Sequence, residues 1–354
     1  MKHLFLRLFF LAVFILAVGS AEQGNAASKK LHKVFILHSY ERDHVCGGPQ
    51  HDGVVEALAA NGYVAGGNLD IEVYAMDTKQ RNNTPELIKR EGEKALRKVW
   101  AYGPDVLVTL DDNAFREVGL KFAGTNTPVV FSGMNAQPED YQTTPPWLDS
   151  RAHPGHNITG VYEKLHFVDA IRVQKNIIPG LKKVLVFTDN SPTGKAIFKQ
   201  IELEMQQETV PCQVDVYVAS SWEDYVETLK KACLDQDVGT LYPGALLLKD
   251  KAGKTYTAKE ILGYTVKYCS KPSIPVNYGF AELGVLGGAG VDFKDMGRQA
   301  GTQVARILNG ERAGDLPIED TRRYALVFNM ARAAELGIVI PPDILLAADE
   351  VYTD

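Results

Sequence analysis

The chain has 354 residues, a net charge of −6 at pH 7 and a hydrophobic content of 45%. A mildly acidic chain without a basic stripe gives no electrostatic reason to expect a nucleic-acid partner. A single hydrophobic core stops growing at about 250–300 residues, so we expect two domains.

The first residues have the order of a secretory signal peptide. Lys2 and Arg7 precede the apolar run Leu8–Val18, and small residues follow it. The run is too short to cross a membrane, which needs about 20 apolar residues. We predict that residues 1–27 are cleaved and that the mature protein is periplasmic. Because the first cysteine is Cys46, we expect no lipid anchor.

Short apolar segments then alternate with amphipathic ones, which is typical of parallel sheets covered by helices on both faces. The first array of expected strands is Val34–Leu37, Ile71–Met76, Asp105–Leu110 and Pro128–Gly133. The second array is Ile158–Val161, Lys183–Thr188, Val214–Ala219, Gly239–Pro243 and Ser273–Gly279. The polar, Pro-rich stretch 137–157 separates the arrays.

This pattern predicts an α/β fold with two doubly wound parallel-sheet lobes. The expected helices are 52–61, 85–102, 113–123, 167–178, 193–208, 222–234, 258–269 and 295–309. We expect the last of them to return to the first lobe. Lobe one is then 28–157 plus about 290–311, and lobe two is 158–289 plus about 312–354.

Polar and aromatic side chains follow most of the expected strands, and in doubly wound sheets ligands bind at these strand ends. In the first half they are Ser39, Tyr40, Asp111, Asp112, Asn113, Ser132 and Asn135. In the second half they are Asp189, Asn190, Thr193, Tyr242 and Tyr278. We predict that together they bind a ligand between the lobes.

Each of these residues also has a simpler explanation. The Asp, Asn and Thr residues are typical helix N-caps, and the two C-terminal tyrosines suit a core that exposes their hydroxyls. Asp111 and Asp112 are harder to explain. Adjacent carboxylates repel each other unless one meets a cation, a donor or a helix N-terminus. A bound amine would serve, so the predicted ligand is a small polar organic molecule, an amino acid or an amine-like compound.

Motifs for catalysis and cofactors are weak. The sequence contains no GxGxxG after the first strand, no GxxxxGK[ST] and no GxSxG elbow. His44, His51 and Asp52 could hold a metal, but histidines near a sheet end more often line a polar site. We interpret the run Gly287–Gly290 as a backbone crossing rather than a phosphate cradle. We predict no enzymatic activity, no cofactor and no metal.

The four cysteines permit disulfides in an oxidising compartment. Right-handed crossovers place the helices 222–234 and 258–269 on the same face of their sheet, with Cys233 and Cys269 at their carboxyl ends. We predict a disulfide between these two, with Cys212 as the rival partner and Cys46 unpaired.

The sequence resembles the substrate-binding proteins of ABC transporters with the class I periplasmic fold. It is most similar to the branch that includes aromatic amino-acid binders. The resemblance runs in order through His38-Ser39-Tyr40, Leu110–Ala114, Pro128–Gly133, Asn157–Val161, Ile177–Gly180, Ile307–Glu311 and Ala334–Ile338. The ligand domains of sensor kinases share the segments around Tyr40 and Asp112.

The resemblance implies two lobes joined by three crossings, which close over a solute and present it to a membrane permease. It places ligand contacts at Tyr40, Asp112, Asn113, Ser132, Asn135, Asp189, Asn190, Tyr242 and Tyr278. We therefore predict a solute-binding protein for an ABC importer. The alternatives are a soluble sensory subunit that signals to a membrane kinase or cyclase, and a hydrolase.

Overall fold

The computed structural model describes residues 30–141, 143–244 and 247–353, so the predicted signal peptide lies outside the described residues. Two parallel sheets and a three-stranded mixed sheet form the framework. The first sheet has the strand order β12-β5-β4-β3-β1-β2, and all its strand pairs are parallel. Its strands are β1 His32–His38, β2 Leu69–Ala75, β3 Val106–Leu110, β4 Val129–Met134, β5 Ile158–Tyr162 and β12 Glu319–Asp320.

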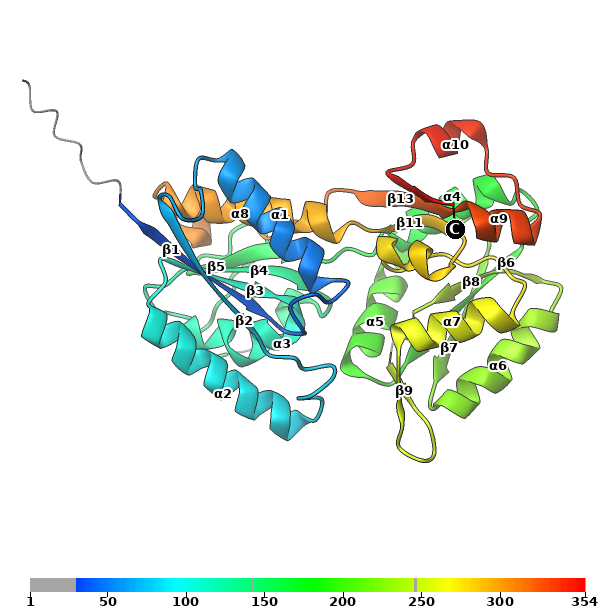
Figure 1. Cartoon of the computed structure of the whole chain (residues 1–354), viewed down its shortest axis with the longest axis horizontal. Helices are drawn as coiled ribbons and strands as arrows, with labels where there is room; N and C mark the ends of the chain where they lie inside the picture. Colours follow the sequence, from blue (N-terminus) through cyan, green and yellow to red (C-terminus); the bar gives the residue numbers. More distant parts are fainter. Residues whose placement is uncertain (1–29, 142, 245–246, 354) are drawn as a thin grey trace, which may run out of the picture. The chain divides into compact units, whose positions relative to one another are not determined.

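Helices cover both faces of this sheet (Figure 1). On one face lie α1 Gly47–Ala60 and α8 Phe293–Leu308, and on the other lie α2 Pro85–Tyr102 and α3 Asp111–Glu117, which the short helix η1 Gly119–Phe122 continues. The alternation of strand side chains explains this: Val34 and Ile36 pack under α1 and α8, whereas Phe35 and Leu37 pack under α2 and α3. Helix α8 packs against the first sheet beside α1.

The second parallel sheet has the order β7-β6-β8, with β6 Lys183–Asp189, β7 Gln213–Ala219 and β8 Val238–Pro243. One core joins it to α4 Phe167–Ile177 and α5 Pro192–Gln207, and another joins it to α6 Trp222–Leu234 and α7 Ala258–Tyr268. Cys233 and Cys269 are joined by a disulfide with their Cα atoms 5.4 Å apart. Cys46 and Cys212 are free.

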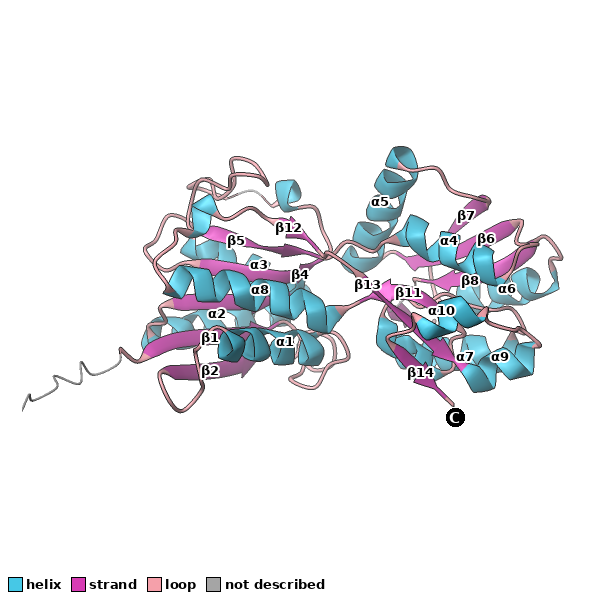
Figure 2. Cartoon of the chain, turned by 90° about the horizontal axis from the view of Figure 1, so that it is seen from above, coloured by secondary structure: helices cyan, strands magenta, loops and turns pink. Residues whose placement is uncertain are grey.

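The remaining strands form a third sheet and a hairpin. The third sheet, β11-β13-β14, contains β11 Gly287–Val291, β13 Tyr324–Asn329 and β14 Glu350–Tyr352 (Figure 2). The hairpin pairs β9 Leu247–Lys249 with β10 Thr255–Thr257. The other elements are η2 Pro138–Asp140, η3 Tyr278–Leu283, η4 Ala313–Asp315, α9 Met330–Leu336 and α10 Pro342–Leu346. The glycine run interpreted as a crossing is thus strand β11, directly before a crossing.

The chain leaves or re-enters the first sheet's layer at three places: after β5, between β11 and α8, and between β12 and β13. Thr321 ties the first crossing to the third, because its Oγ1 accepts from the Lys164 amide at 2.9 Å and its carbonyl contacts Nε2 of His166 at 3.0 Å. Arg323 links the third crossing to the second through Asp292, with Nε 3.6 Å from Oδ2. These contacts define a three-crossing hinge.

Two assignments from the sequence differ from the structure. The strand 158–162, expected to open the second lobe, pairs with β4 in the first sheet, because its apolar pattern identifies a strand but not its sheet. The segment 312–320, also expected in lobe two, leads into β12, which pairs with β5. Across the described part of the chain, no helix is long and apolar enough to cross a membrane.

Candidate functional site

The main candidate site is a cavity of about 390 Å³ at the carboxyl ends of the strands. Its first-sheet side is formed by Tyr40 after β1, by the β2–α2 loop, and by the exposed side of α3. Its second-sheet side is formed by the start of α5 and by Leu247, which follows β8. The lining residues are Tyr40, Thr78, Lys79, Asn83, Pro85, Ile88, Asn113, Arg116, Glu117, Ser191, Pro192, Thr193 and Leu247.

The second-sheet wall is held by Asp189 at the end of β6. Its Oδ1 accepts from the Ser191 amide at 2.8 Å and its Oδ2 from the Leu247 amide at 3.2 Å. Ser191 in turn caps α5 by accepting from the Gly194 amide at 3.0 Å. The buried Asp189 side chain therefore connects the start of α5 to the segment that contains Leu247, and these two segments form this wall.

Of the predicted site residues, Tyr40, Asn113 and Thr193 line this cavity. A smaller neighbouring cavity of about 230 Å³ shares these residues and adds Asp112. Asn113 is oriented by two contacts: its Nδ2 donates to Oγ1 of Thr78 at 2.8 Å, and its Oδ1 accepts from Arg116 at 2.5 Å. These three predicted residues therefore lie at the same cavity, whereas the other predicted residues do not line it.

The aspartate pair finds its partners inside the protein. The Asp112 carboxylate accepts from the backbone amides of Asn135 and Ala136, both at 3.2 Å, and from the Tyr141 hydroxyl at 2.5 Å. Asp111 is buried and accepts from Nε2 of Gln50 at 3.1 Å. A bound amine is therefore not needed to explain these two carboxylates.

Three other predicted residues are buried next to the strand ends and do not line the cavity. Ser39 donates its hydroxyl to the Leu110 carbonyl at 2.7 Å and accepts from the Ala114 amide at 2.7 Å, which fixes the start of α3. Asn135 is buried and donates to Oε2 of Glu163 at 3.1 Å. Ser132 is also buried, and its hydroxyl has no hydrogen-bond partner among the described residues.

Three predicted residues lie elsewhere. Tyr242 is fully buried against Phe167, with ring centroids 5.0 Å apart, because β8 continues one residue beyond it. Tyr278 packs against the third sheet. Asn190 is exposed and lines neither cavity. A polar or aromatic residue at a strand end can thus face either the core or the solvent.

The sequence reading missed Thr78 and Lys79, which line the cavity after the second strand. Thr78 is fixed by its amide and its hydroxyl, which donate to the Ser39 carbonyl at 3.0 and 2.7 Å. The Lys79 ammonium lies 4.0 Å from the centroid of the Tyr40 ring. The same rule that found the other strand ends would have found both residues.

Burial shifts the pKa values of two acids and two histidines near the cavity. Desolvation, opposed by the Lys79 charge and the Gln50 hydrogen bond, raises the pKa of Asp111 to about 7. Desolvation, with repulsion from Asp111 and Asp112, holds the pKa of Glu163 well above its usual range. Desolvation lowers the pKa of His38 to about 3 and that of His51 to about 4. These two rings contact each other, with Nε2 of His38 3.0 Å from Nδ1 of His51.

We expect Asp111→Asn to gain stability relative to the wild type as the pH rises. The folded protein holds the Asp111 proton up to about pH 7, against an ordinary pKa of 3.8. This contribution is complete below pH 3.8 and is lost as the pH rises through 7. The difference in unfolding free energy should shift on the order of 3 kcal/mol in favour of the variant between pH 4 and pH 8. Urea denaturation at several pH values measures it, and a constant difference would contradict the assigned pKa.

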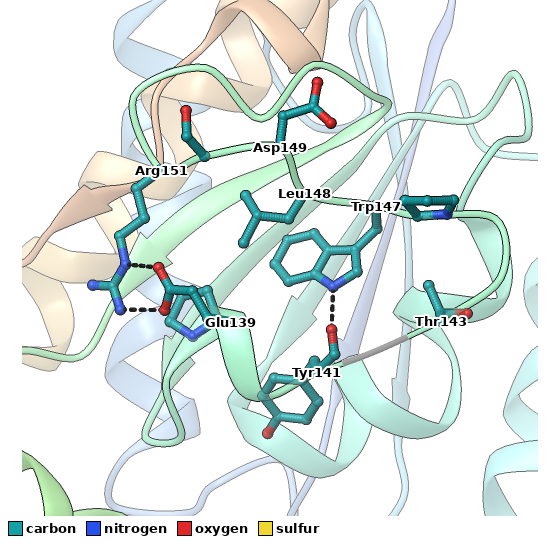
Figure 3. Close-up of a pocket in the computed structure, with 10 residues that line it drawn as sticks. Glu139, Tyr141, Thr143, Trp147, Leu148, Asp149 and Arg151 are labelled. Carbon is teal, nitrogen blue, oxygen red and sulfur yellow. Dashed lines mark hydrogen bonds and ion pairs between the residues drawn. The ribbon is translucent and has the colours of Figure 1, made fainter.

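A separate cavity of about 350 Å³ lies within the loop segment 138–151 of the first lobe (Figure 3). Two of its charged groups pair with each other: Arg151 Nε and Nη2 donate to the two carboxylate oxygens of Glu139, each at 2.8 Å. Trp147 donates from Nε1 to the Tyr141 carbonyl at 2.7 Å. These hydrogen bonds hold together the segment that carries Tyr141, whose hydroxyl donates to Asp112.

Comparison with known proteins identifies the family. The family model described as ABC transporter substrate binding protein matches residues 43–352. The chain therefore belongs to the family of ABC transporter substrate-binding proteins. A comparison with curated protein sequences finds no match.

Solved structures with the same fold are distant in sequence. An ABC domain in complex with L-Trp from Streptococcus pneumoniae has a TM-score of 0.68 and 18% identity, covering 90% of this chain and 99% of the other. A conserved domain protein from Vibrio cholerae has a TM-score of 0.66 and 21% identity, covering 91% and 100%. A ligand-free, open substrate binding protein with adhesive properties from Clostridium difficile has a TM-score of 0.65 and 16% identity, covering 91% and 100%.

Proposed function

We propose that this protein is the extracytoplasmic solute receptor of an ABC importer and captures a small polar organic molecule between two lobes. The observation that carries the proposal is the cavity of about 390 Å³, which is lined by loops and helices that follow strands of both parallel sheets. Its position at the carboxyl ends of parallel strands is the usual ligand position in doubly wound folds. The ligand touches Tyr40, Asn113 and Thr193 in this proposal, with Asp189 holding the second wall.

We divide the lobes at the three crossings. Lobe one consists of residues 31–162 together with 293–320, which contain the first sheet and α8. Lobe two consists of residues 163–291 together with 321–353, which contain the second and third sheets. This division moves the predicted boundary from 157 to 162 because β5 pairs with β4.

We expect ligand to close the lobes about the hinge. A solute that contacts both walls stabilises the arrangement in which they face each other. Small-angle scattering of the mature protein should therefore give a smaller radius of gyration with saturating ligand than without. An unchanged radius, with calorimetry proving that the ligand is bound, would contradict hinged closure.

Mass spectrometry of the protein under native conditions tests the binding function itself. We expect a small molecule to co-purify with material isolated from the periplasm, or a compound from a metabolite library to bind with micromolar affinity. Uptake of that compound by vesicles containing the cognate permease would establish transport. Binding that instead changes the activity of a membrane kinase or cyclase would favour the sensory alternative, and chemical conversion of the bound compound would favour the hydrolase.

A further inference from the structure

The charges that line the main cavity are not balanced. The Glu117 carboxylate accepts from Nε of Arg116 at 2.8 Å, so these two charges form a pair. Lys79 is the other charged residue of the lining, and its ammonium forms no hydrogen bond or ion pair with any described residue. The cavity lining therefore carries one cation that forms no ion pair in the described part of the chain, although its charge also acts on the buried Asp111.

Lys79 is held beside the cavity by its surroundings. Its ammonium lies over the Tyr40 ring, and this cation–π contact leaves the N–H donors available to a third group. The neighbouring Thr78 is fixed to the Ser39 carbonyl through both its amide and its hydroxyl, so the backbone that carries Lys79 is anchored. A positioned, half-buried ammonium of this kind favours an anion.

Two further residues of the lining, Tyr40 and Thr193, carry donors that make no hydrogen bond with the described residues. Tyr40 is only 5% exposed, and its hydroxyl makes no hydrogen bond with the described residues. On the opposite wall the Thr193 amide has no acceptor among the described residues and lies in the first turn of α5. That turn contains no acidic residue, so the helix dipole adds positive potential. Residues with available donors therefore line the cavity from both lobes.

The rest of the lining is largely apolar. Pro85 and Ile88 of α2 stand on the first wall, and Pro192 and Leu247 stand on the second. Such surfaces favour the apolar part of a ligand, because burying apolar surface contributes roughly 25 cal/mol of favourable free energy for each Å² removed from water. An ammonium group on the ligand would be repelled by the Lys79 charge. The nearby carboxylates of Asp112 and Glu117 already have partners within the protein, so they do not offset this repulsion.

We propose that the solute of this cavity is a small organic carboxylate with an apolar body and no cationic group, and that Lys79 is its charge partner. This inference rests on the proposed function and specifies its ligand class. The carboxylate accepts from Lys79, Tyr40 and Thr193, so it bridges the two walls. The apolar body lies against Ile88 and Leu247.

Isothermal calorimetry with matched probes tests the ligand class. The probes are hexanoate and 3-phenylpropanoate, each compared with its amide and its primary amine, together with L-phenylalanine. Against the wild-type protein we expect at least one carboxylate to bind at least tenfold more tightly than its amide and its amine. A charge-assisted hydrogen bond supports a difference of roughly 10- to 100-fold.

Three variants assign the preference to Lys79. Lys79→Met keeps the length of the side chain and should weaken carboxylate binding about 10- to 100-fold while leaving the amide unchanged. Lys79→Arg should restore most of the affinity. Lys98→Met is the matched control, because Lys98 also lies over a tyrosine ring, Tyr74, with Nζ 4.9 Å from its centroid, and is absent from the cavity lining. We expect it to bind like the wild type.

The outcomes separate the two proposals. Preferred binding of an amine or of L-phenylalanine, or carboxylate binding that Lys79→Met leaves intact, would overturn the carboxylate assignment and leave the receptor function standing. If neither the probes nor any co-purified or library compound binds the wild-type protein, the receptor function itself fails. If native mass spectrometry identifies a different ligand, its net charge decides: a cation overturns the inference and an acid supports it.

Discussion

Replacing Gly297 by alanine is expected to lower the free energy of unfolding by about 2–3 kcal/mol, although alanine is the better helix former. Gly297 lies where α8 crosses α1, and a Cβ built on it would stand 2.1 Å from the Gln50 carbonyl oxygen. The obstacle is backbone, so neither helix can relieve the clash by turning a side chain. The reciprocal contact is equally close, since a Cβ on Gly53 would stand 2.1 Å from the Lys294 carbonyl oxygen.

The matched control is Gly263→Ala, the same chemical change inside α7. Gly263 is exposed, and a Cβ there meets no atom within 4 Å. This variant should gain about 0.5–1 kcal/mol from the lower chain entropy of the unfolded state. Urea denaturation of both variants measures the contrast, and effects of the same sign would contradict the close helix contact.

The order of helices and strands is readable from the sequence because each buried strand is apolar on both faces. Val34–Leu37 and Lys183–Thr188 show this directly, and both form strands that helices cover on two sides. The sheet that a strand joins is a long-range property. The apolar sequence of Ile158–Tyr162 would suit a strand beside β4 or beside β6. Its place in the first sheet is known only from the structure, in which Val129 pairs with Ile158.

The candidate site is readable at the level of strand ends and not at the level of each side chain. Tyr40, Asn113 and Thr193 line the cavity, whereas Tyr242 stands one residue before the end of β8 and stays in the core. If the end of a strand is misplaced by one residue, a side chain that lies in the core is predicted to face the ligand, because side chains alternate along a strand. The missed Lys79 had a readable signal, the polar segment that follows the second strand.

The interpretation of Asp111 and Asp112 shows a second limit. Repulsion between adjacent carboxylates is a sound reason to expect a partner, but the sequence cannot say whether that partner is a ligand or the protein. Asp112 finds backbone amides from the segment after β4, and Asp111 finds Gln50 from α1. The partners lie 23, 24 and 61 residues away along the chain. No local pattern links positions so far apart.

Removal of the disulfide, by the double change Cys233→Ala and Cys269→Ala, is expected to lower the free energy of unfolding by about 3–4 kcal/mol. The bond spans a sequence separation of 36 residues, and the chain-entropy model gives a loop of this size roughly that stabilisation. The helices it joins keep other contacts: the Tyr225 hydroxyl is 2.5 Å from Oγ1 of Thr265, and the Trp222 ring packs edge-on against the Tyr264 ring. The double variant should therefore fold at room temperature.

Thermal and urea denaturation of the double variant measure the loss, with and without a reducing agent. The reducing agent should destabilise the wild type by a similar amount and leave the double variant unchanged. Cys212→Ala is the control, because Cys212 is a free cysteine of the same lobe and should keep both the stability and its sensitivity to reduction. A wild type that is equally stable under reducing and oxidising conditions would show that the Cys233–Cys269 bond contributes nothing to the second lobe.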